Sequence, residues 1–242
     1  MEGYHPVMSF DAETAARYRV VRGDEVETVA FLARLAGDGP ALELAIGTGR
    51  IALPLAARGV AVDGIDLSPA MVDRLRAEPG GASMAVTIGD FADVPVAGRY
   101  RVVYVVFNTF FNLLTQDDQI RCFVNVADHL DDEGTFVIEA FTPGWLYQLR
   151  DHQYVDAERI GVSEVVLDVA RHDPVAQLLE ESHVALSPKG IRLNPIVCRY
   201  VWPSELDLMA RLAGLRLRER WATWDRQPLM AGSRNCISVY GR

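Results

Sequence analysis

The chain has 242 residues, and 50% of them are hydrophobic, which is enough to bury one substantial core. It is short for two independent domains, so we expect a single one. The formal net charge of −9 disfavours nucleic acid as a partner, because nucleic-acid binding depends on a basic face that neutralises phosphates.

Composition also argues against a membrane, a disulfide framework and a metal site. No apolar run reaches the length of about 18 residues that indicates a membrane helix. The N-terminus lacks a basic region followed by an apolar stretch, so we expect a cytoplasmic protein without a membrane partner. The 3 cysteines are widely spaced and form no CxxC pattern, which predicts neither disulfides nor a bound metal.

The first part of the chain predicts a helix, a strand, a tight turn and a second helix. The first helix begins after Asp24 and ends at Gly37. Residues 41–46 form a short apolar run typical of a strand, and Gly47-Thr48-Gly49 follows as the turn. The helix after this turn contains Pro54, which we expect to kink it because proline removes a backbone hydrogen bond.

Strands and helices then alternate as far as residue 141. The predicted elements are a strand at 60–66, a helix capped by Ser68 and ending near Glu78, strands at 84–88 and 100–107, a helix opened by Thr115 with Asp118, and a strand at 135–141. This order is typical of βαβ units that build a parallel sheet.

The alternation breaks after residue 141 and resumes at Pro203. Residues 164–170, 178–186 and 191–202 predict three consecutive strands joined by turns, which favours an antiparallel insertion. After it, Ser204 and Asp207 predict a capping box for a helix that ends at Gly214. Two strands follow, at 215–221 and 235–240.

The first strand, turn and helix predict a site for a nucleotide-like ligand. Glycines at this position let the backbone approach a ligand, and the helix N-terminus adds hydrogen-bond donors. The segment Gly47 to Ala52 also matches the G-x-G-x-x-A pattern of dinucleotide sites, with Asp66 near the distance of a ribose-binding acid. A nicotinamide-dependent oxidoreductase is therefore one interpretation.

Two further acids favour a different cofactor. Glu43 lies inside the first strand, and Gly89-Asp90 follows the third. A dinucleotide site needs neither, since a buried acid beside a pyrophosphate would repel it. S-adenosylmethionine (SAM) has no phosphate and carries an ammonium, ribose hydroxyls and an adenine, which acidic side chains at strand ends can bind.

These segments together resemble a known enzyme family. Leu42-Glu43-Leu-Ala-Ile-Gly47-Thr-Gly49-Arg, Gly64-Ile-Asp66-Leu-Ser and Gly89-Asp90-Phe91 look like class I SAM-dependent methyltransferases of the small-molecule type, in order and spacing. The resemblance runs from about Tyr18 to the C-terminus. It implies an α/β fold whose seven-stranded sheet is mostly parallel with an antiparallel last strand, together with an N-terminal helical cap and a small antiparallel β insertion.

The resemblance also implies roles for individual residues. The segment from Glu43 to Gly49 would wrap the methionine portion of SAM, Asp66 would bind the ribose hydroxyls, and Asp90 with Phe91 would meet the adenine. The residues that we expect at the cofactor are Tyr18, Arg22, Glu43, Ala45, Gly47, Gly49, Asp66, Leu67, Met71, Asp90, Phe91 and Phe107. Relatives usually have glycine or cysteine where this chain has Ala45 and Ile46, and Ile46 would either narrow the methionine pocket or point into the core.

The acceptor site is expected at the carboxyl edge of the sheet and under the insertion, because ligands of open α/β folds bind at that edge. The residues that we expect there are Asn108, Phe111, Glu139, Trp145 and Tyr200. His172 lies between Arg171 and Asp173 and is the candidate for a general base, although a histidine in a turn is more often structural.

We therefore expect one domain, residues 1–242. Residues 1–37 would form the helical cap, 38–143 and 203–242 the SAM-binding core, and 144–202 the insertion over the acceptor. The predicted function is methyl transfer from SAM to a small molecule, at nitrogen or oxygen more readily than carbon, in natural-product or sugar metabolism. The predicted assembly is a monomer or homodimer. A SAM-binding protein with another reaction or none, and the nicotinamide enzyme, are the alternatives.

Overall fold

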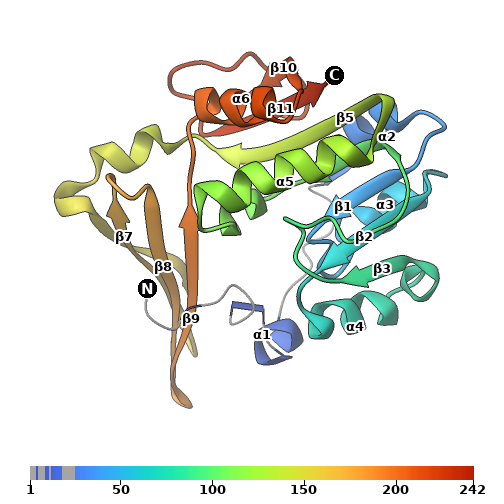
Figure 1. Cartoon of the computed structure of the whole chain (residues 1–242). Helices are drawn as coiled ribbons and strands as arrows, with labels where there is room; N and C mark the ends of the chain where they lie inside the picture. Colours follow the sequence, from blue (N-terminus) through green and yellow to red (C-terminus); the bar gives the residue numbers. More distant parts are fainter. Residues whose placement is uncertain (1–3, 5–8, 11, 18–24) are drawn as a thin grey trace.

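A computed structural model describes residues 4, 9–10, 12–17 and 25–242 of the chain. Its centre is a sheet of seven strands in the order β10-β11-β5-β4-β1-β2-β3 (Figure 1). The strands are β1 (Ala41–Leu44), β2 (Val62–Asp66), β3 (Ala85–Ile88), β4 (Tyr100–Val105), β5 (Leu130–Phe141), β10 (Arg216–Trp221) and β11 (Asn235–Gly241). β11 pairs antiparallel with both of its neighbours, while β1 to β5 are mutually parallel, so the predicted fold class is confirmed.

Helices cover both faces of this sheet. They are α1 (Ala12–Arg17), α2 (Val26–Ala36), α3 (Ala52–Ala56), α4 (Pro69–Ala77), α5 (Gln116–His129) and α6 (Pro203–Leu212). Side chains of α2, α3 and α4 pack with one face of the central strands, and those of α5 and α6 pack with the other. β4 is buried on both faces, which explains its continuous apolar sequence.

The predicted insertion is a second, antiparallel sheet in the order β6-β7-β8-β9. Its strands are β6 (Gln153–Ile160), β7 (Val165–Asp173), β8 (Leu178–Ser187) and β9 (Gly190–Arg199), preceded by short 3₁₀ turns at Pro143–Gln148 and Arg150–His152. The sequence predicted only three of these strands. β6 was missed because it is an edge strand whose side chains, Tyr154 apart, are exposed and mostly polar.

A buried polar network fixes the insertion to the core. Arg199, at the end of β9, donates from NH1 to Gln119 Oε1 of α5 at 2.5 Å and from NH2 to Glu205 Oε1 of α6 at 2.9 Å. Gln119 returns a bond from Nε2 to the Arg199 carbonyl at 2.9 Å. Such a charged pair is stable under burial only when its remaining hydrogen-bonding groups are satisfied. Here Gln119 bonds Arg199, and Gln116 and Gln177 donate to Glu205.

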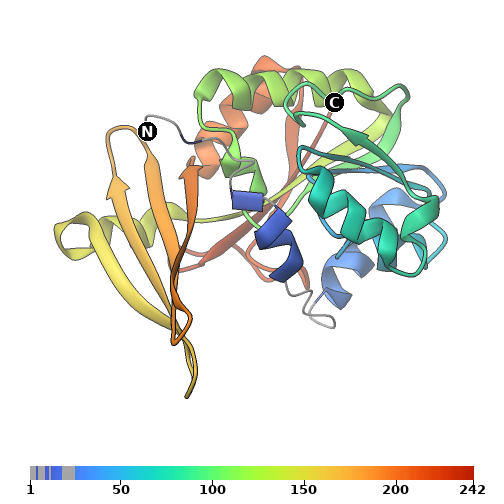
Figure 2. The same ribbon diagram turned by 90° about the horizontal axis from the view of Figure 1, so that it is seen from below.

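The N-terminal residues bridge the two sheets. Figure 2 shows α1 between the insertion sheet and the central part of the molecule. On one side the Ser9 hydroxyl donates to the Pro195 carbonyl of β9 at 2.5 Å. On the other side the Phe10 carbonyl accepts from the Ser68 hydroxyl at 2.6 Å, and the Ala15 carbonyl accepts from Arg74 of α4.

The helix starts follow the sequence signals in two cases and depart from them in one. Ser68 caps α4 by accepting from Met71 N, and Thr115 caps α5 by accepting from Asp118 N at 3.0 Å, as predicted. The capping box predicted for α6 is wrong: α6 begins at Pro203 without a side-chain cap, and Asp207 instead binds Arg220 and Tyr240.

The expected kink at Pro54 is also absent. α3 is only five residues long, and Pro54 lies in its first turn, where a backbone N–H has no intrahelical partner to lose. The predicted N-cap Asp24 lies outside the described residues.

Ile46 packs in the core against β2 and also borders the cavity at the carboxyl edge of the sheet. It is only 3% exposed, and it packs on Gly64, where an added Cβ would lie 2.4 to 2.9 Å from three atoms of its side chain. The large side chain in the first loop is thus accommodated by a glycine on the neighbouring strand.

We predict that Gly64→Ala lowers the free energy of unfolding by about 1–3 kcal/mol, because a methyl group must be forced against Ile46 in a close-packed region. Ile46→Ala in the same chain should restore part of this loss, since it removes two of the three close atoms. Urea unfolding of the four chains of this cycle measures the coupling. Gly232→Ala is the control, because no atom lies within 4 Å of its added Cβ; equal losses in both glycine variants would contradict the packing account.

Candidate active site

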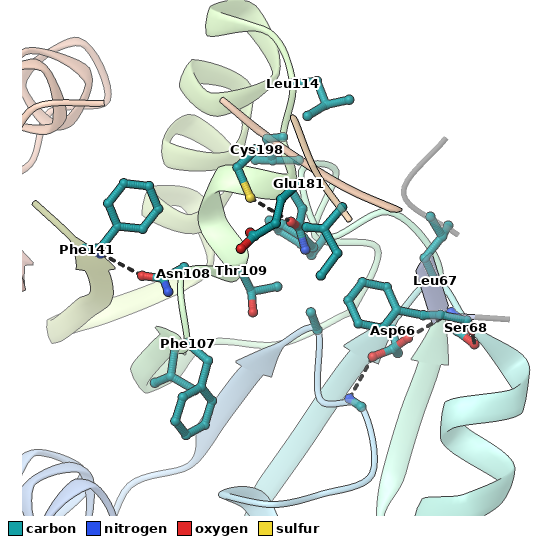
Figure 3. A pocket seen from close by; sticks show the side chains of 18 of the residues that line it. Asp66, Leu67, Ser68, Phe107, Asn108, Thr109, Leu114, Phe141, Glu181 and Cys198 are labelled. Atoms are coloured by element: carbon teal, nitrogen blue, oxygen red, sulfur yellow. Dashed lines mark hydrogen bonds between the residues drawn. The ribbon is translucent and has the colours of Figure 1, made fainter. Parts of the chain in front are cut away.

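One cavity of about 850 Å³ opens along the carboxyl ends of the central strands and reaches the inner face of the insertion sheet. Its walls come from the loops after β1, β2, β3 and β4 on one side and from β6, β7, β8 and β9 on the other. In Figure 3, Asp66 and Ser68 lie at one side of the cavity, Asn108 and Phe141 at the other, and the Glu181 carboxyl points into it.

Three buried carboxyl groups tie the central loops together. The first is Glu43 in β1, which is 3% exposed and accepts a hydrogen bond from the Tyr104 hydroxyl of β4 at 3.0 Å. The backbone N–H of Ala52, at the start of α3, also donates to Glu43. Burial raises the pKa of the Glu43 carboxyl to about 8.

The second carboxyl is Asp66 at the end of β2. Its Oδ2 accepts from Gly47 N at 2.7 Å and its Oδ1 accepts from Ser68 N at 2.8 Å. Burial raises the pKa of Asp66, and the backbone donors partly oppose that shift. Asp66 therefore fixes the glycine turn after β1 from the neighbouring strand.

The third carboxyl, Glu139 of β5, fixes the loop after β4. Its Oε2 accepts from Phe107 N at 3.0 Å and its Oε1 accepts from Trp224 Nε1 at 2.9 Å. Phe107 and Asn108 both have positive φ, 55° and 63°, which is uncommon for non-glycine residues. The Asn108 side chain accepts from Phe141 N at 2.6 Å, so the unusual backbone is held from two directions.

The loop after β1 has a similar conformational cost. Ala45 has a φ of 58°, in the left-handed region where an L-residue with a Cβ is strained. The resembling family usually has glycine or cysteine where this chain has Ala45 and Ile46. The structure thus keeps the glycine-like backbone despite the alanine.

Most of the side chains predicted at the cofactor line the cavity. These are Glu43, Ala45, Gly47, Asp66, Leu67, Met71, Asp90, Phe91 and Phe107. Gly49 does not: an added Cβ there would lie 2.1 Å from Leu75 of α4, so this glycine permits packing of the loop on a helix. Tyr18 and Arg22 lie outside the described residues, whereas Tyr4 and Phe10 of the N-terminal segment line the cavity.

The residues predicted at the acceptor divide into two groups. Asn108 and Trp145 line the cavity. Phe111, Glu139 and Tyr200 lie behind its wall: Phe111 and Tyr200 are fully buried, and Glu139 supports the Phe107 backbone.

His172, the predicted base, also lies behind the wall. Its ring is 2% exposed, its Nε2 lies 2.7 Å from the Tyr200 hydroxyl, and it packs edge-on against Tyr147. Burial lowers the pKa of this imidazole. This position does not support a direct role for His172 on a molecule in the cavity.

The sequence analysis missed an acidic group on the inner face of the insertion. The Tyr154 hydroxyl of β6 donates toward Glu181 Oε1 of β8 at 2.9 Å and toward Asp168 Oδ2 of β7 at 3.2 Å. All three side chains line the cavity. The sequence did contain a signal. Asp168 lies two residues from buried Val166 and from buried Ala170, and Glu181 lies two residues after buried Leu179, so both acids share the inward face of their strands.

Comparison with known proteins identifies the family. Residues 41–134 match a family model described as a methyltransferase domain. The solved structure of the CcbJ methyltransferase from Streptomyces caelestis is 38% identical, superposes with a TM-score of 0.90, and is matched over 98% of this chain and 99% of its own. The chain belongs to the class I SAM-dependent methyltransferases. The methyltransferase therefore uses SAM, which decides against the nicotinamide interpretation.

More distant structures share the fold of this methyltransferase. A SAM-dependent methyltransferase from Clostridium acetobutylicum is 13% identical with a TM-score of 0.79, and the match covers 90% of this chain and 92% of that one. The sugar N-methyltransferase KedS8 from Streptoalloteichus is 18% identical with a TM-score of 0.68, over 95% and 92% of the two chains. Curated protein sequences give no match. Among the described residues of the methyltransferase, no helix has the length and apolar character needed to cross a membrane.

The buried carboxyl of Glu43 gives a prediction about stability and pH. Its folded pKa of about 8 exceeds its ordinary value of 4.5, so between these pH values the folded protein holds a proton that the unfolded chain has lost. The free energy of unfolding should fall as the pH rises through this window. Glu43→Gln should flatten the fall, and urea unfolding at several pH values measures it. Glu27→Gln, on an exposed position of α2, is the control; an unchanged slope in Glu43→Gln would show that Glu43 is ionised in the fold.

Proposed function

We propose that the methyltransferase transfers the methyl group of SAM to a nitrogen or oxygen nucleophile of a small molecule from natural-product or sugar metabolism. The observation that supports this most strongly is the continuity of the cavity, which joins the loops of the cofactor motif to the insertion sheet. A space closed by an insertion suits a small acceptor. The named activity of KedS8, a sugar N-methyltransferase, agrees with this acceptor class.

The donor groups of the cofactor half fit SAM. Asp66 and Asp90 present carboxylates, and Phe91 and Met71 present apolar surface, so the half is suited to ribose hydroxyls, an adenine amino group and a flat ring. An anionic pyrophosphate would be repelled by the same acids. Gly47, with a φ of 57°, leaves room for close approach of a ligand to the backbone.

When bound, SAM supplies a methyl group activated by a positively charged sulfur. The chain itself then has to exclude water and hold the nucleophile in line with the methyl–sulfur bond. We assign the exclusion of water to the insertion, residues 144–202, and to the helical cap, residues 1–37. Residues 38–143 and 203–242 hold the cofactor in this scheme. Asn108 and Trp145 are the predicted acceptor residues that have access to the cavity.

Titration calorimetry tests the cofactor half. We expect SAM and its demethylated product S-adenosylhomocysteine to bind and NAD to give no heat. Asp66→Asn should weaken the product's affinity by about 1.5–3 kcal/mol, because it removes a charge-assisted bond and loosens the Gly47 turn.

Asp63→Asn is the matched control for Asp66→Asn. Asp63 lies on the same strand but binds the Tyr100 hydroxyl at 2.8 Å, and it does not line the cavity. Normal affinity in Asp66→Asn, or equal losses in both variants, would refute the assignment of Asp66.

A further inference from the structure

The insertion-sheet side of the acceptor half presents carboxyl groups, while the Arg234 guanidinium also lines the cavity. Asp168 and Glu181 place two carboxyl groups in its wall, and the Tyr154 hydroxyl is the hydrogen-bond donor that reaches both. Asp168 Oδ1 is buried and has no hydrogen-bond partner among the described residues, and its ion-pair contact is with His183 Nδ1 at 4.0 Å. Buried oxygens of this kind normally have hydrogen-bond partners, so a ligand that carries donors would satisfy this one.

The pKa of the Glu181 carboxyl is shifted by its surroundings in the cavity wall. Burial, together with the neighbouring Asp168, raises the pKa of the Glu181 carboxyl to about 7. The other titratable groups near it are Tyr154, which donates to it, His183 on the same strand, and the Cys198 thiol on β9. Near neutral pH, the Glu181 carboxyl is therefore partly protonated.

Resting on the proposed function, we infer that the acceptor carries a basic amine, which Asp168 and Glu181 bind as an ammonium beside the Tyr154 hydroxyl. An ammonium brings up to three donors and a positive charge, whereas an alcohol brings one donor and no charge. The rings of Trp145 and Tyr154, with centroids 5.8 Å apart, add aromatic surface that suits a sugar face, and the Arg234 guanidinium lies 5.9 Å from the Trp145 centroid.

A metal ion is the other cation to consider. Asp168, Glu181 and His183 bring possible ligand atoms within 4.8 Å of one another. However, His183 Nδ1 lies 3.0 Å from Glu158 Oε2, and the Tyr154 hydroxyl, which has one hydrogen to donate, lies within hydrogen-bond distance of both carboxyls. The donor-bearing amine fits this arrangement better than a metal, which needs free lone pairs on every ligand.

The same carboxyl group can accept the proton that methylation requires. An ammonium nitrogen has no free lone pair, so one of its protons first passes to the Glu181 carboxylate. The freed nitrogen lone pair then forms the new N–C bond while the methyl–sulfur bond breaks, and the electron pair of that bond stays on sulfur. Glu181 returns its proton to solvent after release of the methylated ammonium product.

The test uses matched pairs of probes with the protein saturated by S-adenosylhomocysteine. The pairs are benzylamine and benzyl alcohol, cyclohexylamine and cyclohexanol, and glucosamine and glucose. We expect at least one amine to bind about tenfold or more tightly than its alcohol, as charge-assisted bonds imply. Calorimetry in two buffers of different ionisation enthalpy should also show proton release on amine binding at about pH 6, because a bound cation favours the ionised form of Glu181.

Glu181→Gln and Asp168→Asn should each remove the preference for amines and the proton release while leaving the affinity for S-adenosylhomocysteine unchanged. Glu180→Gln is the matched control, because Glu180 is adjacent on β8 but pairs with Arg171 and does not line the cavity. Absence of amine preference in the unmodified protein, its survival in both cavity variants, or chelator-sensitive binding of Mn²⁺ at the pair would overturn the inference. Failure of S-adenosylhomocysteine to bind would instead overturn the proposed function.

Discussion

A buried carboxyl group must find hydrogen-bond donors, and in this fold three of them find donors on a neighbouring strand or its loop. Asp66 and Glu139 each bond a loop that another strand carries to the same edge, and Glu43 bonds the Tyr104 side chain of the neighbouring strand β4. The edge that forms the cavity is therefore set by cross-strand bonds as well as by the sheet. The loop strain at Ala45 and Phe107 is stable because these bonds and the packing behind them determine the backbone.

The insertion is held by a different device. The buried pair of Arg199 and Glu205, together with Gln119, joins the last strand of the small sheet to α5 and α6. The N-terminal segment adds contacts from the opposite side, through Ser9 and Phe10. The two halves of the cavity are thus held in register by polar contacts at two separate places, which suits an enzyme that must align two ligands within a fraction of an ångström.

Periodicity and local chemistry predicted the central sheet because its elements obey local rules. The Ser68 cap, the Thr115 cap and the continuous apolar β4 depend only on neighbours in sequence. β6 was missed because an exposed edge strand has no hydrophobic alternation. Glu139 and His172 were expected in the cavity but lie behind its wall, since a sequence shows which strand holds a residue and not which layer covers it. Asp168 and Glu181 needed a count of polar residues at inward positions of a strand, which the pattern of turns alone does not supply.

The small sheet is contributed by one uninterrupted stretch of chain between β5 and α6. The stretch that carries the cavity side chains of that sheet is joined to the central fold by two chain connections. The strands that hold the cofactor motif are instead distributed along the rest of the sequence. Under the proposed function, recombination of this one stretch between homologues would exchange the acceptor-facing side chains of the insertion together. The acceptor of such enzymes could then change in evolution while the strands that bind the methyl donor stay the same.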